Sequence, residues 1–173
     1  MAMQMLRAGG VAAMTDEIRT PDADNPRGYF EFERVKQLKS DTSWLDEAHG
    51  KVVKIIHLLL MELPADREYR VIFMRRDLHE VVQSQATMLQ RSGRRGAALT
   101  PERLIALFLG QLKSVEVWLA ARPNFKVLYL DHAQFITNSA AQAHAINMFL
   151  GGTLDEAAMA KAVDPSLHRN RSN

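Results

Sequence analysis

One junction in this sequence constrains the fold more than any other feature. The apolar run Val71 to Met74 ends in two arginines, Arg75 and Arg76. Asp77 then opens a helical pattern that continues to Arg91, and aspartate is a favoured residue at helix N-caps. A strand that passes directly into a helix is the unit from which open α/β sheets are built, and these sheets bind ligands at the carboxyl ends of their strands. The junction therefore predicts an α/β fold with a ligand site near Arg76.

The rest of the chain repeats this alternation of strand and helix. Residues 51–56 and 125–130 are dominated by apolar residues and predict two further strands beside that of residues 69–74. Thr100, Pro101 and Glu102 form a typical helix start, and apolar spacing continues that helix to about residue 122. We expect shorter helical segments at 1–8, 31–39, 57–63, 140–150 and 154–163. Strands that alternate with helices predict βαβ units and a mostly parallel sheet.

Composition limits the classes of function. The 173 residues suffice for one domain with its own core. The absence of cysteine excludes disulfides and cysteine nucleophiles, and the six histidines lack metal-ligand spacing, so we expect no metal. The net charge of +2 does not indicate nucleic-acid binding, and apolar runs such as 55–61 are too short for a membrane span. We therefore expect a single soluble, cytoplasmic domain over residues 1–173.

Arg76 and Ser84 are the residues of the junction best suited to bind an anion. They lie eight residues apart, so Ser84 falls about two turns into the helix. A guanidinium offers a planar set of donors that suits phosphate, and a hydroxyl adds one donor. The alternative is that Arg76 pairs with Asp77 or Glu80 and that Ser84 is solvated, as is usual for surface residues.

This segment resembles the 3′-phosphate-binding motif of sulfotransferases, in which a strand-end arginine and a serine eight residues later bind 3′-phosphoadenylyl sulfate. Further blocks resemble bacterial members of that superfamily in the same order: residues 24–33 (DNPRGYFEFE), 72–78 (IFMRRDL), 149–152 (FLGG) and 164–169 (DPSLHR). The resemblance implies a three-layer αβα fold of the P-loop NTPase type. It also implies transfer of a sulfuryl group from 3′-phosphoadenylyl sulfate to a hydroxyl or amine of a small-molecule, glycan or peptide acceptor.

The chain departs from this family at its amino terminus. The family's other signature, a GxPRSGT/S loop, cradles the 5′-phosphosulfate with backbone N–H groups. This sequence lacks such a loop, and residues 1–10 resemble the helix that follows it. Either the true start lies upstream or the first, central strand is truncated. A vacant sheet position would leave backbone groups unpaired, so we expect the chain to be inactive in transfer and to form homo-oligomers through that position, or to precipitate. The alternative function is an inactive nucleotide-binding or interaction module derived from a sulfotransferase.

Sulfuryl transfer requires a cation near the transferring group and a base for the acceptor proton. Lys54, within the predicted strand 51–56, resembles the strand lysine of the family. The catalytic histidine that follows this lysine by two residues in cytosolic members is replaced by Ile56. His57 is one step out of register, on the opposite face of a regular strand.

A carboxylate is therefore the better candidate for the base. Some sulfotransferases place a glutamate in the region after the first helix, where Glu31 is our first candidate and Glu17 our second, ahead of Asp16 and Glu33. For each of these residues the alternative is an exposed surface charge.

Two further residues correspond, by resemblance, to nucleotide contacts. His132 follows the strand 125–130, where relatives carry a nucleotide-contacting tyrosine, and Arg169 is a candidate for the 3′-phosphate. The alternative for Arg169 is a disordered basic tail.

Overall fold

Two parallel strands form the centre of the molecule. The computed structural model describes residues 1–16, 18, 28–91, 93 and 99–164. Strand β1 (Tyr69–Arg75) pairs with β2 (Phe125–Asp131) over their whole lengths, from Tyr69 opposite Phe125 to Arg75 opposite Asp131. The predicted strands at 69–74 and 125–130 and their parallel pairing are therefore confirmed. No gap separates β1 from β2, and among the described residues no strand pairs with the other edge of β1.

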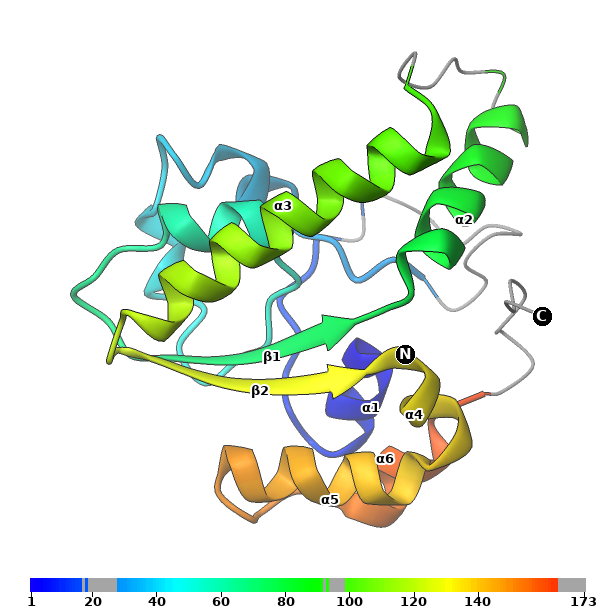
Figure 1. Ribbon diagram of the computed structural model, residues 1–173. Coiled ribbons are helices and arrows are strands. Elements are labelled where there is room, and N and C mark those ends of the chain that lie inside the picture. The colour runs from blue at the N-terminus through cyan, green and yellow to red at the C-terminus, as the bar shows by residue number, and fades with distance from the viewer. Residues whose placement is uncertain (17, 19–27, 92, 94–98, 165–173) are drawn as a thin grey trace.

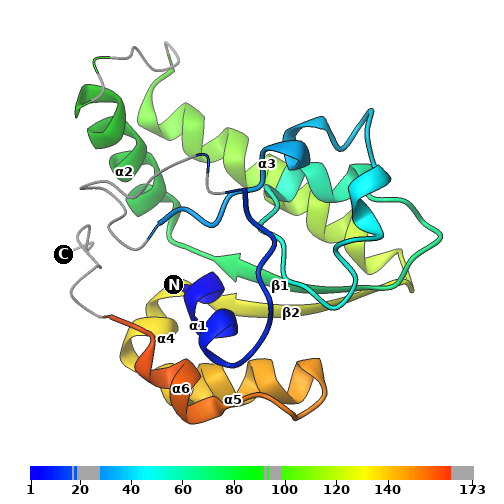
Figure 2. The ribbon, with the colours of Figure 1, turned by 180° about the vertical axis from the view of Figure 1, so that it is seen from behind.

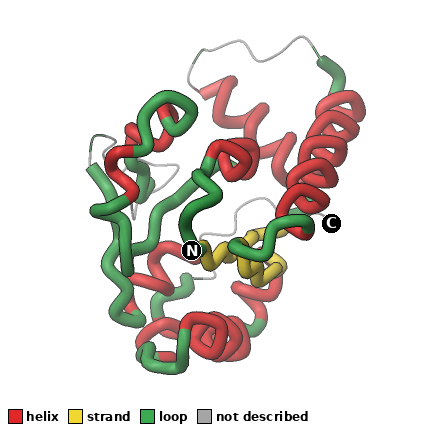
Figure 3. Tube along the Cα trace, turned by 90° about the vertical axis from the view of Figure 1, so that its left-hand side faces the viewer, coloured by secondary structure: helices red, strands yellow, loops and turns green. Residues whose placement is uncertain are grey.

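Helices cover both faces of this small sheet, which gives the expected three layers (Figures 1, 2 and 3). Helix α3 lies over one face, with α2 beside it, and α1, α5 and α6 lie on the other face. The α-helices are α1 (Ala2–Ala8), α2 (Leu78–Arg91), α3 (Pro101–Ala120), α4 (His132–Thr137), α5 (Ser139–Leu150) and α6 (Glu156–Lys161). The described residues also form the 3₁₀ helices η1 (Glu33–Gln37), η2 (Ser43–Leu45) and η3 (His57–Glu62).

A separate apolar core lies on each side of the sheet. Successive residues of a strand point to opposite faces, so Phe73 packs into the core beneath α3, whereas Ile72 and Met74 pack against the other core. The α3 side contains the fully buried Trp44, and the opposite side contains the fully buried Phe135. A strand whose two faces are both covered has few polar positions, which explains the nearly continuous apolar runs in β1 and β2.

The helix starts follow from local capping. The Asp77 carboxylate accepts hydrogen bonds from the backbone N–H groups of His79 (2.7 Å) and Glu80 (3.2 Å) at the start of α2. The Thr100 hydroxyl accepts from Arg103 N (3.4 Å) ahead of α3. Both predicted starts are confirmed. Helix α4, which the sequence analysis did not predict, is capped in the same way by Asp131.

The prediction of a third strand over residues 51–56 is wrong. Within this segment Val52 forms an isolated parallel bridge with Ala13, and residues 53–56 belong to neither helix nor strand. The β-branched side chains favour an extended backbone, but a ladder also needs a neighbouring strand. Among the described residues no such neighbour lies beside residues 53–56. The predicted helical turn that follows is confirmed as η3.

Candidate functional site

A cavity of about 1640 Å³ runs along β1. Residues 52–57 line one part of it and residues 69–74, almost the whole of β1, line another. The side chains of Glu31 and Lys54 also border this cavity. Two candidate catalytic residues from distant parts of the sequence therefore open onto one space beside the sheet.

Lys54 and Glu31 form an ion pair. The Lys54 Nζ atom lies 3.3 Å from Glu31 Oε1 and also donates a hydrogen bond to the Tyr29 carbonyl oxygen at 3.3 Å. The Glu31 side chain is 29% exposed and that of Lys54 is 46% exposed, so both remain accessible to a bound molecule. The structure thus brings together the first-choice base and the candidate cation.

An unusual backbone turn positions Glu31. Gly28 has φ of 85°, and Phe30 has φ of 50°, a left-handed conformation that is uncommon for a bulky residue. Such strain persists where surrounding contacts fix it, often at functional sites. Here the Arg7 guanidinium lies 6.0 Å from the centre of the Phe30 ring, and Asp16 N donates to the Glu31 carbonyl oxygen at 3.2 Å.

The other carboxylates considered as bases have different roles or lie outside the described residues. Asp16 accepts hydrogen bonds from the backbone N–H groups of Glu33 (2.5 Å) and Ile18 (3.2 Å), so it ties the chain to the Glu31 segment. Glu33 pairs with Lys36 at 2.6 Å, and this hydrogen bond raises the pKa of Lys36. Glu17 lies outside the described residues.

Arg76 lies just beyond β1, as predicted, but an acid already engages it. Its Nε atom lies 3.3 Å from Glu80 Oε2, with side-chain exposures of 30% for Arg76 and 12% for Glu80. Glu80 and Ser84 follow Arg76 at intervals of four residues, and this spacing places Glu80 and Ser84 on one face of α2. No hydrogen bond between Arg76 and the half-buried Ser84 occurs in the described part of the chain. The structure therefore shows the pairing that was the alternative prediction for Arg76.

The neighbouring Arg75 has a structural role. Its guanidinium binds Glu116 of α3 at 2.9 Å and lies 4.3 Å from the centre of the Tyr129 ring. Arg75 thereby links α3 to both strands. Because Arg75 pairs with a glutamate of α3 whereas Arg76 pairs with one of α2, Arg75 provides a matched control for mutagenesis of Arg76.

His132 lies at the same edge of the sheet as Arg76. It is the first residue of α4 and follows Asp131, which is opposite Arg75 in the sheet register. Arg76 and His132 therefore continue the chain at the adjacent carboxyl ends of two parallel strands, where open α/β sheets bind ligands. His132 is half-buried. Arg169 lies outside the described residues.

The segment that contains Glu31 and the start of α2 lie on the same side of the sheet (Figures 1 and 2). In Figures 1 and 2 the chain that follows Gly28 runs on the α3 side of β1, in the direction of the start of α2. Glu31 belongs to this segment, and Arg76 lies between β1 and α2.

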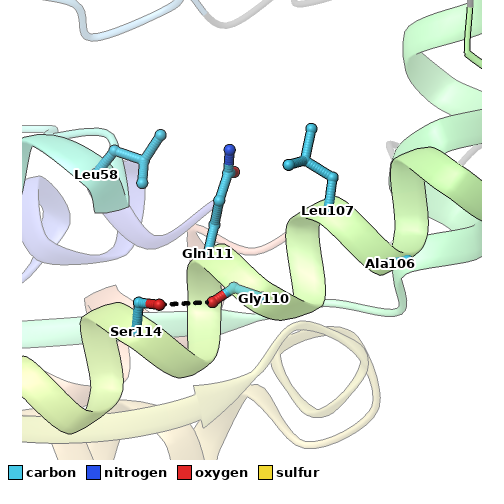
Figure 4. Close-up of a pocket in the computed structure, with 6 residues that line it drawn as sticks. All are labelled: Leu58, Ala106, Leu107, Gly110, Gln111 and Ser114. Carbon is cyan, nitrogen blue, oxygen red and sulfur yellow. Dashed lines mark hydrogen bonds between the residues drawn. The ribbon is translucent and has the colours of Figure 1, made fainter.

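A second hollow, of about 450 Å³, lies on the outer side of α3 (Figure 4). Its lining residues are Leu58, Ala106, Leu107, Gly110, Gln111 and Ser114. The Ser114 hydroxyl donates to the Gly110 carbonyl oxygen at 2.9 Å. None of these lining residues carries a charge, so the hollow does not suit a phosphosulfate.

Within the described ranges, no three histidine, aspartate or glutamate side chains gather in a way that could hold a metal ion. Nor does any helix in those ranges have the length and apolar character required to cross a membrane.

Sequence reasoning missed the parts of the site that the backbone supplies. Nothing singled out the Tyr29 carbonyl oxygen, and Arg7 was read only as part of the first helix. Gly28 was the available signal for this turn. A glycine three positions before Glu31 permits the left-handed backbone conformation that directs the following residues.

Searches against protein-family models, curated proteins and solved structures found no match. The resemblance to sulfotransferases therefore rests on the sequence blocks alone.

Proposed function

We propose that this protein is a sulfotransferase-family protein that transfers a sulfuryl group from 3′-phosphoadenylyl sulfate to an acceptor. The observation that carries the proposal is the Lys54–Glu31 pair, with 3.3 Å between Nζ and Oε1, at the border of the cavity beside β1. Two residues that were selected as base and cation for this chemistry, 23 positions apart, meet in space. The sequence blocks shared with bacterial sulfotransferases support the same chemistry.

In the proposed reaction, an oxygen or nitrogen of the acceptor attacks the sulfur of the phosphosulfate. A bond forms from the acceptor to sulfur as the bond from sulfur to the phosphate oxygen breaks. The Glu31 carboxylate takes the acceptor proton. The Lys54 ammonium group stabilises the negative charge that develops on the bridging oxygen. The products are a sulfated acceptor and adenosine 3′,5′-bisphosphate.

Arg76 and Ser84 are the proposed partners of the 3′-phosphate, with His132 beside them at the sheet edge. A phosphate would have to replace the Glu80 carboxylate at Arg76, and it can do so because a guanidinium binds phosphate through two parallel hydrogen bonds. The 5′-phosphosulfate requires donors beyond these residues. In the family that role belongs to the GxPRSGT/S loop, which this sequence does not contain.

Calorimetric titration with adenosine 3′,5′-bisphosphate tests the nucleotide site. We expect the wild-type protein to bind and the Arg76→Ala variant to lose most of its affinity. The Arg75→Ala variant should retain it, because Arg75 binds Glu116 instead. The titration should also be run on the chain extended at Met1 by a strand and a GxPRSGT/S loop. Equal affinity of wild type and Arg76→Ala in both forms would end the assignment.

The second candidate function is nucleotide binding without transfer. One observation favours it: Arg76 already pairs with Glu80. A transfer assay with radiolabelled 3′-phosphoadenylyl sulfate separates the two functions. Binding without transfer by both the chain and its extended form would select the second candidate. Transfer that appears only in the extended form would select the first.

A further inference from the structure

One short segment is hydrogen-bonded to the chain around both members of the proposed catalytic pair. Residues 12–14 bond to Val52 through two backbone hydrogen bonds, from Val52 N to Ala12 O at 2.8 Å and from Met14 N to Val52 O at 2.9 Å. These two bonds make an isolated parallel bridge. Lys54 follows Val52 by two residues, so the bridge fixes the chain that carries the candidate cation.

Asp16, two residues beyond Met14, bonds to the chain on both sides of the Glu31 side chain. Its backbone N–H donates to the Glu31 carbonyl oxygen at 3.2 Å, and its carboxylate accepts a hydrogen bond from Glu33 N at 2.5 Å. Glu33 is the first residue of η1, and the first N–H groups of a helix have no acceptor inside it. Asp16 supplies that acceptor from 17 positions away. One residue therefore holds the backbone at Glu31 and again two residues later.

The Asp16 carboxylate accepts two hydrogen bonds, of which the one from Glu33 is better shielded from water. Asp16 and Glu33 are half-buried, and Met14 is buried in the core on the α3 side. The other bond comes from the N–H of the exposed Ile18, at 3.2 Å, where water can replace the carboxylate. A charged acceptor makes the stronger hydrogen bond, and a shielded donor that loses its acceptor is costly. We therefore expect Asp16 to act mainly through Glu33.

We infer that Asp16 is a positioning residue for the proposed base. Neither Glu31 nor Lys54 lies in a helix or a strand, so no ladder or helical turn sets their relative position. Residues 12–16 connect the two stretches of chain, since the bridge lies at one end of this segment and Asp16 at the other. These contacts set the 3.3 Å distance between Lys54 Nζ and Glu31 Oε1. The catalytic part of this inference rests on the proposed sulfuryl transfer, whereas the positioning of the pair does not.

Competitive acylation of the chain as it stands tests the positioning without any ligand. A trace of acetic anhydride labels amines, and mass spectrometry gives the rate at Lys54 relative to that at Lys126, which is exposed on β2. An ammonium group that is paired with a carboxylate reacts more slowly. Asp16→Ala should therefore raise the relative rate at Lys54 about two- to fivefold. Asp16→Asn should stay near the wild-type rate, because its amide oxygen still accepts from Glu33 N.

A second variant breaks the same hydrogen bond from its other end. Glu33→Pro removes the donor N–H, and proline is well tolerated at the first position of a helix. The preceding Phe32 has an extended backbone, which is the conformation that a following proline favours. Glu33→Pro should raise the acylation rate at Lys54 as much as Asp16→Ala does, and the double variant should add nothing further. Circular dichroism establishes that each variant remains folded.

Kinetics of the protein extended by a phosphosulfate loop test the catalytic part. Asp16→Ala should lower kcat by up to about 10²-fold with little change in the KM of the donor, since it displaces the base without touching the nucleotide site. Asp16→Asn should restore most of the rate, because asparagine keeps an acceptor oxygen. The control for both measurements is Asp41→Ala, which should give wild-type values, since the Asp41 carboxylate bonds to Arg34 instead.

The outcomes separate this inference from the proposed function. Wild-type acylation rates at Lys54 in both Asp16→Ala and Glu33→Pro would overturn the positioning role. An equal loss of kcat in Asp16→Asn and Asp16→Ala would also overturn it, because Asp16 would then serve as the base itself. A raised acylation rate without transfer by any form would support the positioning of Glu31 and refute sulfuryl transfer.

Discussion

The two halves of the proposed site are built in opposite ways. The Arg76 half comes from one continuous stretch, in which β1, the Asp77 cap and α2 follow each other directly. The Lys54 half joins segments that are far apart in the sequence: Lys54, the turn from Gly28 to Glu31, and Asp16, which bonds to that turn. One half is fixed by regular secondary structure, and the other by tertiary contacts alone.

This difference has a functional consequence. In the Arg76 half the proposed binding group lies between a strand and a helix but is already paired with Glu80. In the Lys54 half the reactive groups already meet, but a strained turn holds them there, with Phe30 in a left-handed conformation. We therefore expect ligand affinity to be limited by competition at Arg76, and catalysis to be limited by the order of the turn at Glu31.

The largest expected effect concerns the proposed base. In the protein extended by a phosphosulfate loop, Glu31→Gln should lower the rate of sulfuryl transfer by about 10²–10⁴-fold. Affinity for adenosine 3′,5′-bisphosphate should stay near that of the wild type. Steady-state kinetics with radiolabelled donor measures the rate. The matched control is Glu33→Gln, because Glu33 pairs with Lys36 instead of Lys54. Unchanged turnover in Glu31→Gln would move the role to Glu17 or Asp16.

The next effect tests the turn. Gly28 has φ of 85°, so the Gly28→Ala variant should lose about 1–2 kcal/mol of unfolding free energy, since an L-residue is strained there. Gly110 in α3 is the control: it has no atom within 4 Å of an added Cβ, and Gly110→Ala should gain about 0.5–1 kcal/mol. Urea denaturation measures both. Equal stability changes in the two variants would show that the turn is not strained.

A smaller effect concerns the competition at Arg76. The Glu80→Gln variant removes the charge that Arg76 now binds, so its affinity for adenosine 3′,5′-bisphosphate should rise by up to about tenfold, equivalent to 1.4 kcal/mol. Isothermal titration calorimetry measures the dissociation constant. Weaker binding in this variant would show that Glu80 holds Arg76 in its binding position and does not compete with the ligand.

The smallest effect lies outside both halves and provides a reference for acid titrations. Hydrogen bonds from Ser43 and Arg34 lower the pKa of Asp41 from its ordinary 3.8 to about 2. Because the folded pKa lies below the unfolded one, this network stabilises the fold above pH 3.8, and the stabilisation is lost as the pH falls towards 2. Asp41→Asn should flatten the dependence of the urea midpoint on pH in that window. An unchanged dependence would contradict the lowered pKa.

Local signals were enough to predict the strand-to-helix junction that carries Arg76. Sequence alone reveals the apolar run, the Asp77 cap and the spacing of Arg76 and Ser84, because each depends on residues that are close in the sequence. The competing Glu80, four residues after Arg76, can be recognised in the same way. The strand at 51–56 was mispredicted because its composition encodes an extended backbone, whereas a ladder depends on a partner. The Lys54–Glu31 contact spans 23 residues through turns and the short 3₁₀ helices η1 and η2. Sequence reasoning could nominate both residues but could not place them together.

The central claim is that both halves serve one ligand. A nuclear magnetic resonance titration of the wild-type protein with adenosine 3′,5′-bisphosphate tests it most directly. We predict that the amide signals of Arg76, Ser84 and Lys54 shift together and give a single dissociation constant, because the 3′- and 5′-phosphates contact different halves of one site. Signals at Arg76 and Ser84 that shift while Lys54 stays unchanged, or the reverse, would contradict this account.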